Sequence, residues 1–401
     1  MGATSWLQAR IPFSRRRSYQ RPRWGHTLKI TCLTENLASG GAQRQLCSLA
    51  VLLKTRGWDV SVLTYFPQNF FQSYLIDNGV SHLEFDGCNR LSRIFEIRRI
   101  LRNSDHDVVL SFLRTPNILA EISSFPGRKW GLVVSERTGW PNGQETRESW
   151  RTWFHYLADY VVVNSNKNRG ILTFQAPWLI KKVRTIYNSV DLERFKPDSS
   201  GNQEDDVIRL LVVGRVSAEK NVFGLMRAFR KVVDCFPGKD IQLDWYGDSF
   251  KETGAGVQGP DGLFVRALKM RAALGLEKRF HFFPPTVDIA AKYQQASALI
   301  LASFYEGMPN VVCEAMASGL PVLMSDVGDA RELVIDGKDG FVFDSNADDD
   351  IAAKIGDFVR LPVAEKRSLG EFSRMRAVEM FGEERFVGQF ADLLEAASER
   401  L

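Results

Sequence analysis

Two glutamates stand eight residues apart in the segment 305–319, on either side of a proline. Pro309 suits the first position of a helix, and no Ser, Thr or Asp precedes it as a cap, so the first-turn amides could bind an anion. Glu314 falls on this helix among apolar and small residues, where a buried carboxylate needs hydroxyl or amide donors. A ligand rich in hydroxyl groups would supply them, although water or backbone would also serve. Glu306 and Glu314 are therefore candidate ligand-binding residues.

Two basic side chains five residues apart follow an expected strand at 207–213. Gly214 and Arg215 come directly after the strand, and Lys220 stands before the next expected helix. A planar guanidinium and a compact ammonium at this edge of a sheet suit a diphosphate. For either cation alone, a solvated surface residue is the simpler interpretation.

Two glycines mark a third feature, in the first half of the chain. Gly40 and Gly41 follow an expected strand at 28–34 and open a helix. Because glycine lets the backbone approach a ligand closely, a phosphate could lie here. By themselves, the two glycines are better explained by a plain turn.

Strands alternate with helices along almost the whole chain, which is typical of parallel sheets covered on both faces. In the first half we expect strands at 28–34, 59–64, 107–112, 131–135, 160–163 and 183–187, and helices at 42–56, 91–102, 145–158 and 166–176. In the second half we expect strands at 207–213, 241–246, 279–283, 298–302, 321–324 and 340–343, and helices at 221–235, 261–274, 287–295, 309–318, 328–336, 347–360, 363–379 and 382–399. The predicted fold class is α/β, with two doubly wound Rossmann-like domains facing a cleft and ligands at the carboxyl ends of the strands.

A length of 401 residues predicts two or three domains. The polar, turn-rich stretch at 197–206 is the expected linker. We predict a basic tail at 1–27, an N-terminal domain at 28–197 and a C-terminal domain at 206–380, followed by a last helix at 381–401 that packs back on the N-terminal domain.

The composition excludes several classes of protein. With 44% hydrophobic and 25% charged residues the chain is an ordinary globular protein, and no apolar run reaches the roughly 18 residues of a membrane span. The five cysteines include no Cys-x-x-Cys pair, which argues against a disulfide framework or a zinc site and favours a reduced, cytoplasmic compartment. The first 27 residues contain six Arg but no apolar signal-peptide core.

The charge of the chain is distributed unevenly, because residues 1–200 carry a formal charge of +12 and residues 201–401 carry −8. A basic half fits a domain that faces an anionic surface, either nucleic acid or membrane headgroups. An unevenly charged, solvated surface explains the asymmetry equally well. The basic residues are dispersed and lack the interleaved aromatic residues of stacking platforms, so we expect no nucleic-acid partner.

Taken together, these segments resemble glycosyltransferase family four, whose members are retaining enzymes with the GT-B fold. The resemblance covers about residues 28–398. In the second half it rests on Gly214, Arg215 and Lys220, on the segment 306–322 and on 336–341. In the first half, the segments 40–44, 110–117 and 135–137 look like bacterial members that add N-acetylgalactosamine to polyprenyl-diphosphate-linked sugars.

The resemblance implies a donor site on the C-terminal domain. Arg215 and Lys220, next to Gly214, would hold the donor diphosphate. Glu314 would bind the ribose hydroxyls, and Glu306 the transferred sugar. Further donor contacts are implied for the backbone of Gly307, Met308, Pro309 and Asn310, for the loop of Pro285, Thr286 and Val287 near the base, and for Gly41 from the first domain. On the acceptor side, where many members have a histidine, this chain offers Glu136 and Arg137.

The charges of this site predict a reaction without a metal ion or cofactor. Arg215, Lys220 and the helix-end amides would stabilise the negative charge that develops on the leaving diphosphate. The acidic triplet 348–350 opens an expected helix, where acids favour the positive end of the helix dipole, so we do not expect it to bind metal.

The resemblance implies a retaining hexosyltransferase. It would move a sugar from a UDP-N-acetylhexosamine or UDP-hexose to a lipid-linked or other glycan acceptor in bacterial surface-polysaccharide assembly. The basic half and the tail would hold it peripherally on the anionic inner face of the cell membrane. Two alternatives stay open: a nucleotide-sugar epimerase or phosphorylase with similar paired domains, and a less favoured non-enzymatic nucleic-acid-binding protein.

Overall fold

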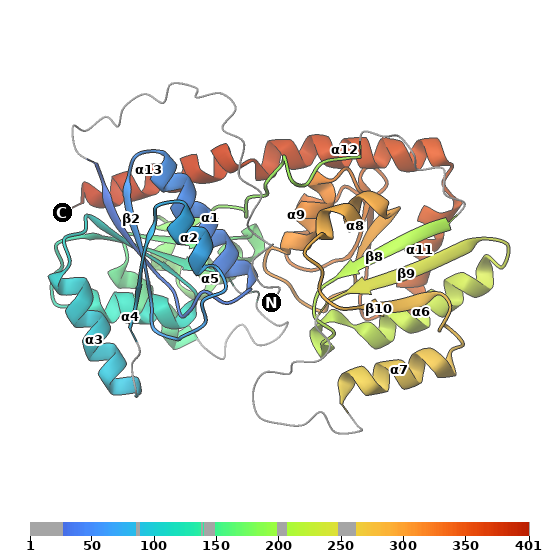
Figure 1. The fold of residues 1–401 in the computed structure, drawn as a ribbon, viewed down its shortest axis with the longest axis horizontal. Helices are drawn as coiled ribbons and strands as arrows, with labels where there is room; N and C mark the ends of the chain where they lie inside the picture. Colours follow the sequence, from blue (N-terminus) through green and yellow to red (C-terminus); the bar gives the residue numbers. More distant parts are fainter. Residues whose placement is uncertain are drawn as a thin grey trace. The chain divides into compact units, whose positions relative to one another are not determined.

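The computed structural model describes residues 27–85, 89–137, 139, 149–198, 207–247 and 262–400. The expected basic tail up to residue 26 and residues 199–206 of the expected linker lie outside these ranges. The chain forms two compact units, one comprising the residues up to Ser189 together with Glu383–Leu401, and the other Val190–Gly382 (Figure 1).

The first unit contains a seven-stranded parallel sheet in the order β3-β2-β1-β4-β5-β6-β7. Its strands are β1 Lys29–Leu33, β2 Asp59–Thr64, β3 Ser81–Glu84, β4 Val108–Phe112, β5 Gly131–Glu136, β6 Tyr160–Val163 and β7 Val183–Thr185. Its helices are α1 Gly41–Thr55, α2 Gln72–Asp77, α3 Arg90–Asn103, α4 Arg114–Ser124, α5 Asn166–Gln175 and α13 Glu383–Ser398, with 3₁₀ segments η1 Ser149–Leu157 and η2 Pro177–Leu179.

Both faces of this sheet are buried, as expected for parallel strands. Successive residues of β4 belong to different cores: Val108 and Leu110 pack with α1 and α13, whereas Val109 packs with α3 and α4. The last helix, α13, supplies Phe386 and Phe390 to the first of these cores. Burial of such side chains contributes about 1.5–3 kcal/mol each to stability.

The second unit contains a six-stranded parallel sheet in the order β10-β9-β8-β11-β12-β13. Its strands are β8 Val207–Val213, β9 Asp240–Tyr246, β10 Phe280–Phe283, β11 Ala298–Leu301, β12 Val322–Ser325 and β13 Gly340–Phe343. Its helices are α6 Val222–Cys235, α7 Leu263–Ala273, α8 Ile289–Gln295, α9 Asn310–Ala317, α10 Ala330–Leu333, α11 Asp348–Arg360 and α12 Val363–Phe381, with the 3₁₀ turn η3 Ala218–Lys220. The predicted α/β class with two doubly wound parallel sheets is confirmed.

The structure adds elements that the sequence pattern did not predict: α2, β3, α4 and η2. Helix α4 includes Pro116 in its first turn, where proline is tolerated because its missing N–H would be unpaired there in any case. The helix expected at 145–158 is instead the 3₁₀ segment η1, and the helix expected at 328–336 is reduced to α10.

The boundary between the units lies at Ser189, eight residues before the predicted end of the N-terminal domain at 197. Residues 190–198 pack with the second unit. The Val190 N–H donates to the Phe381 carbonyl (3.0 Å), and Arg374 donates to the Phe195 carbonyl (2.8 Å). The ring of Phe195 also contacts that of Tyr293, which explains why the polar stretch after it is not the structural boundary.

Candidate functional site

The candidate donor residues gather where the strand order of the second sheet reverses. From β8 the chain builds β9 and β10 on one side and then returns to form β11 on the other. Ligands of doubly wound sheets bind at such a switch point, outside the carboxyl ends of the strands. The segment from Gly214 to Lys220 follows β8, and the segment from Ser303 to Glu306 follows β11.

Lys220 and Glu306 meet at this switch point. The Lys220 ammonium donates to Glu306 Oε1 over 2.5 Å, and the Ser303 hydroxyl donates to the same oxygen over 2.7 Å. Both charged side chains are mostly buried. The structure therefore brings together the two residues assigned to the diphosphate and to the transferred sugar.

The backbone around Lys220 is held firmly. Asn221 adopts a left-handed conformation (φ 54°), which asparagine tolerates, and its side chain caps α6 by accepting from the Gly224 N–H. The same side chain donates to the Ser345 carbonyl over 2.8 Å. These two bonds fix the residue that follows Lys220.

The carboxyl ends of β8 and β9 lie in close contact beside the site. The Trp245 indole donates to the Gly214 carbonyl over 2.8 Å. A Cβ at Gly247 would lie 1.8 Å from the same carbonyl oxygen, so only glycine fits there.

The loop after β11 is held by the loop after β12. The Ser325 hydroxyl donates to the Ser303 carbonyl (2.6 Å). Gly328 has a φ of 58°, and a Cβ there would lie 2.9 Å from the Gly307 carbonyl oxygen. The backbone on both sides of Glu306 thus packs against the end of β12 and the residues that follow it.

Helix α9 begins at Asn310, so Pro309 is its N-cap rather than its first helical residue as predicted. No side-chain cap bond forms at this helix end among the residues that the structure describes. The N–H groups of Val312 and Cys313 donate to the Pro309 carbonyl. The anion site predicted at this helix end, with Met308 beside it, stays a prediction.

Glu314 is buried on α9, and its partner is a residue that sequence reasoning missed. The hydroxyl of Tyr293, on α8, donates to Glu314 Oε2 over 2.9 Å, and both side chains are buried. The hydroxyl donor that the buried carboxylate requires is therefore supplied by the protein. No spacing rule links Tyr293 to Glu314, since they lie on different helices.

Other predicted donor residues lie at the same edge but are more exposed. The side chain of Arg215 is 70% exposed and lies 3.7 Å from Glu219. Burial acts to raise the pKa of Glu219, but the net shift is downward. The pKa is lowered by the Ser217 hydroxyl, by backbone donation and by the charges of Arg215 and Lys220. Thr286 and Val287 follow β10, where the Thr286 hydroxyl accepts from the Asp288 N–H (3.2 Å).

The acidic triplet at 348–350 forms the first turn of α11. Asp348 pairs with Arg227 and Asp349 with Lys231, two cations of α6, while Asp350 accepts from the Asp344 N–H. The carboxylates are thus engaged in joining α11 to its neighbours. In the described ranges, no cluster of three or more His, Cys, Asp or Glu side chains could hold a metal ion.

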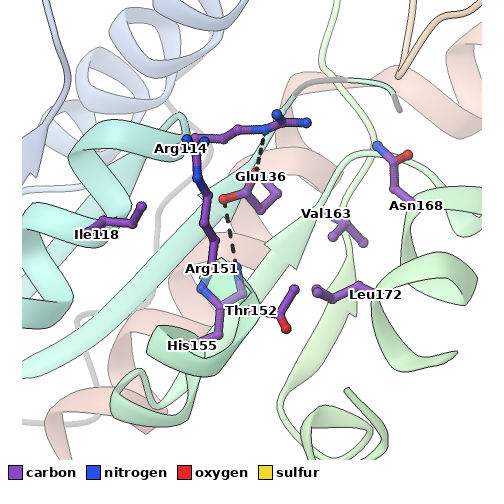
Figure 2. Close-up of a pocket in the computed structure, with 9 residues that line it drawn as sticks. All are labelled: Arg114, Ile118, Glu136, Arg151, Thr152, His155, Val163, Asn168 and Leu172. Atoms are coloured by element: carbon purple, nitrogen blue, oxygen red, sulfur yellow. Dashed lines mark ion pairs between the residues drawn. The ribbon is translucent and has the colours of Figure 1, made fainter. Parts of the chain in front are cut away.

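In the first unit, Glu136 lies in a pocket that also contains a histidine (Figure 2). Glu136 Oε1 accepts from the Asn117 amide (2.8 Å) and lies 3.7 Å from Nε2 of His155. Arg114 Nε lies 3.9 Å from the other carboxylate oxygen. The pocket is lined by Arg114, Ile118, Glu136, Arg151, Thr152, His155, Val163, Asn168 and Leu172.

His155 connects Glu136 to a second, fully buried carboxylate. Its Nδ1 donates to Glu121 Oε1 over 2.6 Å. Burial opposes protonation, but the carboxylates of Glu121 and Glu136 outweigh it and raise the pKa of His155. Burial raises the pKa of Glu121. Sequence reasoning missed His155, because it lies in an expected helix that carries no motif.

Arg137 lies apart from this pocket, although it follows Glu136 directly. Its guanidinium stacks on Phe112 and Phe390, with 4.3 Å and 5.5 Å to the ring centroids, and it donates to Asn188 (2.9 Å). Burial lowers its pKa to about 9. Gly41 is exposed at the first turn of α1. Of the two predicted acceptor-side residues, the pocket thus contains Glu136 alone.

Comparison with known families identifies the chain. Residues 39–194 match the model of Glycosyltransferase Family 4, and residues 194–376 match that of Glycosyl transferases group 1. The chain belongs to the glycosyltransferases. The two matches meet near the boundary between the structural units, and they favour glycosyl transfer over the epimerase, phosphorylase and nucleic-acid-binding alternatives.

Curated relatives of this glycosyltransferase act in glycan biosynthesis. The GalNAc-alpha-(1->4)-GalNAc-alpha-(1->3)-diNAcBac-PP-undecaprenol alpha-1,4-N-acetyl-D-galactosaminyltransferase of Campylobacter jejuni is 27% identical, over 81% of this chain and 86% of that protein. The amylovoran biosynthesis glycosyltransferase AmsD of Erwinia amylovora is 25% identical, over 82% and 90%.

Solved structures show that the glycosyltransferase has the GT-B fold. Anabaena HepE in complex with UDP-glucose matches 92% of this chain and 100% of that chain with a TM-score of 0.76 and 19% identity. The lipopolysaccharide outer core galactosyltransferase WaaB matches 92% and 99%, with a TM-score of 0.71 and 17% identity. None of the helices described here is both long and apolar enough to span a bilayer.

Proposed function

We propose that this glycosyltransferase is a retaining enzyme that moves a hexose or N-acetylhexosamine from a UDP-sugar to a lipid-linked glycan in bacterial surface-polysaccharide assembly. The pair of Lys220 with Glu306 at the switch point of the second sheet carries the proposal. The UDP-glucose complex of HepE and the undecaprenol-linked substrate named for the Campylobacter relative support the two substrate classes. The enzyme works peripherally at the inner face of the cell membrane.

Lys220 is the cation of the donor site. An ammonium group carries three hydrogens, and Glu306 accepts one of them, which leaves two for phosphate oxygens. When the bond between sugar and diphosphate breaks, negative charge grows on the leaving group, and a fixed cation lowers this barrier. Arg215 adds a second, more mobile cation.

Glu306 and Glu314 bind different parts of the donor. Glu306, held by Lys220 and Ser303, accepts hydrogen bonds from hydroxyls of the transferred sugar. Glu314, fixed by Tyr293, accepts from the ribose hydroxyls. Their positions after β11 and on α9 suit ligand groups arranged along the sheet edge.

The pocket around Glu136 receives the acceptor. Its apolar side chains Ile118, Val163 and Leu172 suit the carbon face of a sugar ring, and Glu136 accepts a hydrogen bond from a ring hydroxyl. Nε2 of His155 and Nε of Arg114 lie 3.7 Å and 3.9 Å from the two oxygens of this carboxylate.

Two measurements test this proposal. The product formed from an α-linked UDP-sugar should retain the α configuration in its NMR anomeric coupling, whereas a β product would refute the retaining mechanism. Titration calorimetry should show that Glu314→Gln weakens UDP binding about tenfold, since a ribose hydroxyl loses its charged acceptor. The control is Glu371→Gln, an exposed carboxylate on α12, which should bind UDP as the wild type does.

A further inference from the structure

Exposed aromatic and aliphatic side chains gather on three neighbouring elements of the first unit. They lie on η1, at the end of α5 and on η2 with its following residue, and their exposed fractions run from 42% at Trp178 to 86% at Phe174. The set comprises Trp150, Trp153, Tyr156, Phe174, Trp178 and Ile180. Soluble proteins rarely expose so much contiguous apolar surface unless it binds something.

Contacts between these elements make the side chains one surface. The rings of Trp153 and Trp178 lie 4.7 Å apart, which joins η1 to η2. The Lys182 ammonium lies 5.1 Å from the centre of the Tyr156 ring and donates to the Tyr156 carbonyl. Helix α5 runs directly into η2.

The spacing on η1 separates an outer from an inner face. A 3₁₀ helix has three residues per turn, so Trp150, Trp153 and Tyr156 follow one another along one side. Thr152 directly precedes Trp153, and His155 directly precedes Tyr156. Both Thr152 and His155 are buried and line the pocket around Glu136. The same segment thus carries exposed aromatic rings on one side and pocket residues on another.

The charged side chains of this region are basic with one exception. Between residues 149 and 190 the sequence contains six basic residues, Arg151, Lys167, Arg169, Lys181, Lys182 and Arg184, and a single acidic one, Asp159. Asp159 is buried and pairs with Arg128 over 2.6 Å. Its charge is therefore compensated inside the unit, and the exposed charged side chains of this stretch, Lys167, Arg169, Lys181 and Arg184, are all basic.

We propose that this aromatic–basic surface, formed by the six apolar side chains and by the exposed Lys167, Arg169, Lys181 and Arg184, lies on an anionic membrane leaflet. Trp and Tyr favour the headgroup level, and basic side chains near an anionic leaflet are attracted to its headgroups. The charge complementarity selects a lipid surface rather than a second copy of the chain, because two copies would bring like charges together. The purpose of this contact rests on the proposed lipid-linked acceptor, whose pocket shares η1 and α5 with the surface.

The test is sedimentation of the full chain with vesicles, which needs no catalytic activity. We expect binding to vesicles of phosphatidylcholine with phosphatidylglycerol, weak binding to phosphatidylcholine alone, and release by high salt. The triple variant Trp153→Ser, Tyr156→Ser, Phe174→Ser should bind at least about tenfold more weakly, since three apolar groups lose their lipid contact. The control Leu91→Ser, Phe95→Ser removes comparably exposed side chains of α3 and should bind normally.

Three outcomes overturn the proposal. The first is normal binding by the triple variant, especially if Arg15→Ser, Arg16→Ser, Arg17→Ser in the N-terminal tail abolishes binding instead. The second is equal binding to neutral vesicles, or none at all. The third is a dimer in solution that the triple variant converts to a monomer, which would make the surface a self-association interface. UDP binding measured on the same samples separates failure of this surface from failure of the proposed function.

Discussion

Lys220 on η3 donates to Glu306 Oε1 over 2.5 Å, joining the segments that follow β8 and β11 in the second sheet. The pair keeps a cation and a carboxylate side by side where the strand order reverses. The proposed UDP-sugar donor carries phosphates next to a hydroxyl-bearing sugar ring. A cation beside a carboxylate suits these two neighbouring groups.

Removal of the Lys220 charge should reduce catalysis far more than stability. We expect Lys220→Ala to lower kcat/KM about 100–1000-fold, because a cation no longer opposes the charge of the leaving diphosphate. Arg215→Ala should have a smaller effect, because its side chain is 70% exposed. Lys231→Ala, which removes a lysine of α6 that pairs with Asp349, is the control and should leave steady-state kinetics unchanged. Near-normal kcat/KM in Lys220→Ala would contradict the assignment.

The two glutamates should affect different kinetic constants. Glu306→Ala should chiefly lower kcat, since the transferred sugar changes during the reaction, whereas Glu314→Gln should chiefly raise KM for the donor. Tyr293→Phe removes the hydroxyl that holds Glu314 and should produce a weaker form of the Glu314→Gln effect. Equal changes of both constants in the two glutamate variants would contradict this division of roles.

His155 should stabilise the protein at low rather than high pH. Because Glu121 and Glu136 raise its pKa, its contribution is fully present below the ordinary value of 6.5 and is lost as pH rises through the raised value. The free energy of unfolding should therefore decrease above pH 6.5. Glu121→Gln removes the main partner of His155, so the free energy of unfolding of this variant, measured by denaturation, should decrease less over the same pH range. If the variant has the same pH dependence as the wild type, the pair of His155 and Glu121 does not control it.

His106 should have the opposite effect. Burial lowers its pKa to about 4, so the unfolded chain binds a proton more readily between that value and 6.5. Stability should fall as pH decreases through this window, by up to about 3 kcal/mol for the single group. Urea denaturation at several pH values should show that His106→Gln loses less stability than the wild type as the pH falls from 6.5 to 4. If the free energy of unfolding falls equally with pH in both proteins, other groups cause the loss of stability in acid.

The sequence alone predicted every strand of the two sheets except β3, because apolar runs are a local signal and β3 (Ser81–Glu84) is a short, mostly exposed edge strand without one. It also singled out Lys220 and Glu306, which lie in loops that follow strands, and the structure brings the two side chains together. Their roles in donor binding stay a prediction. It did not predict Tyr293 beside Glu314 or His155 between two carboxylates, since these contacts join segments far apart in the chain. Nor did it place the unit boundary, because the contacts of Val190 and Phe195 with the second unit are equally nonlocal.

Transfer of label from a UDP-sugar tests the central claim most directly. The protein would be incubated with labelled UDP-hexoses and UDP-N-acetylhexosamines, a bacterial lipid extract and EDTA, and the lipid fraction and free UDP would be measured. We predict that label from one donor enters the lipid fraction, that one UDP is released per sugar, and that Lys220→Ala abolishes both. Label that stays in an epimerised nucleotide-sugar, release that requires inorganic phosphate, or transfer that EDTA abolishes and magnesium restores would contradict the account.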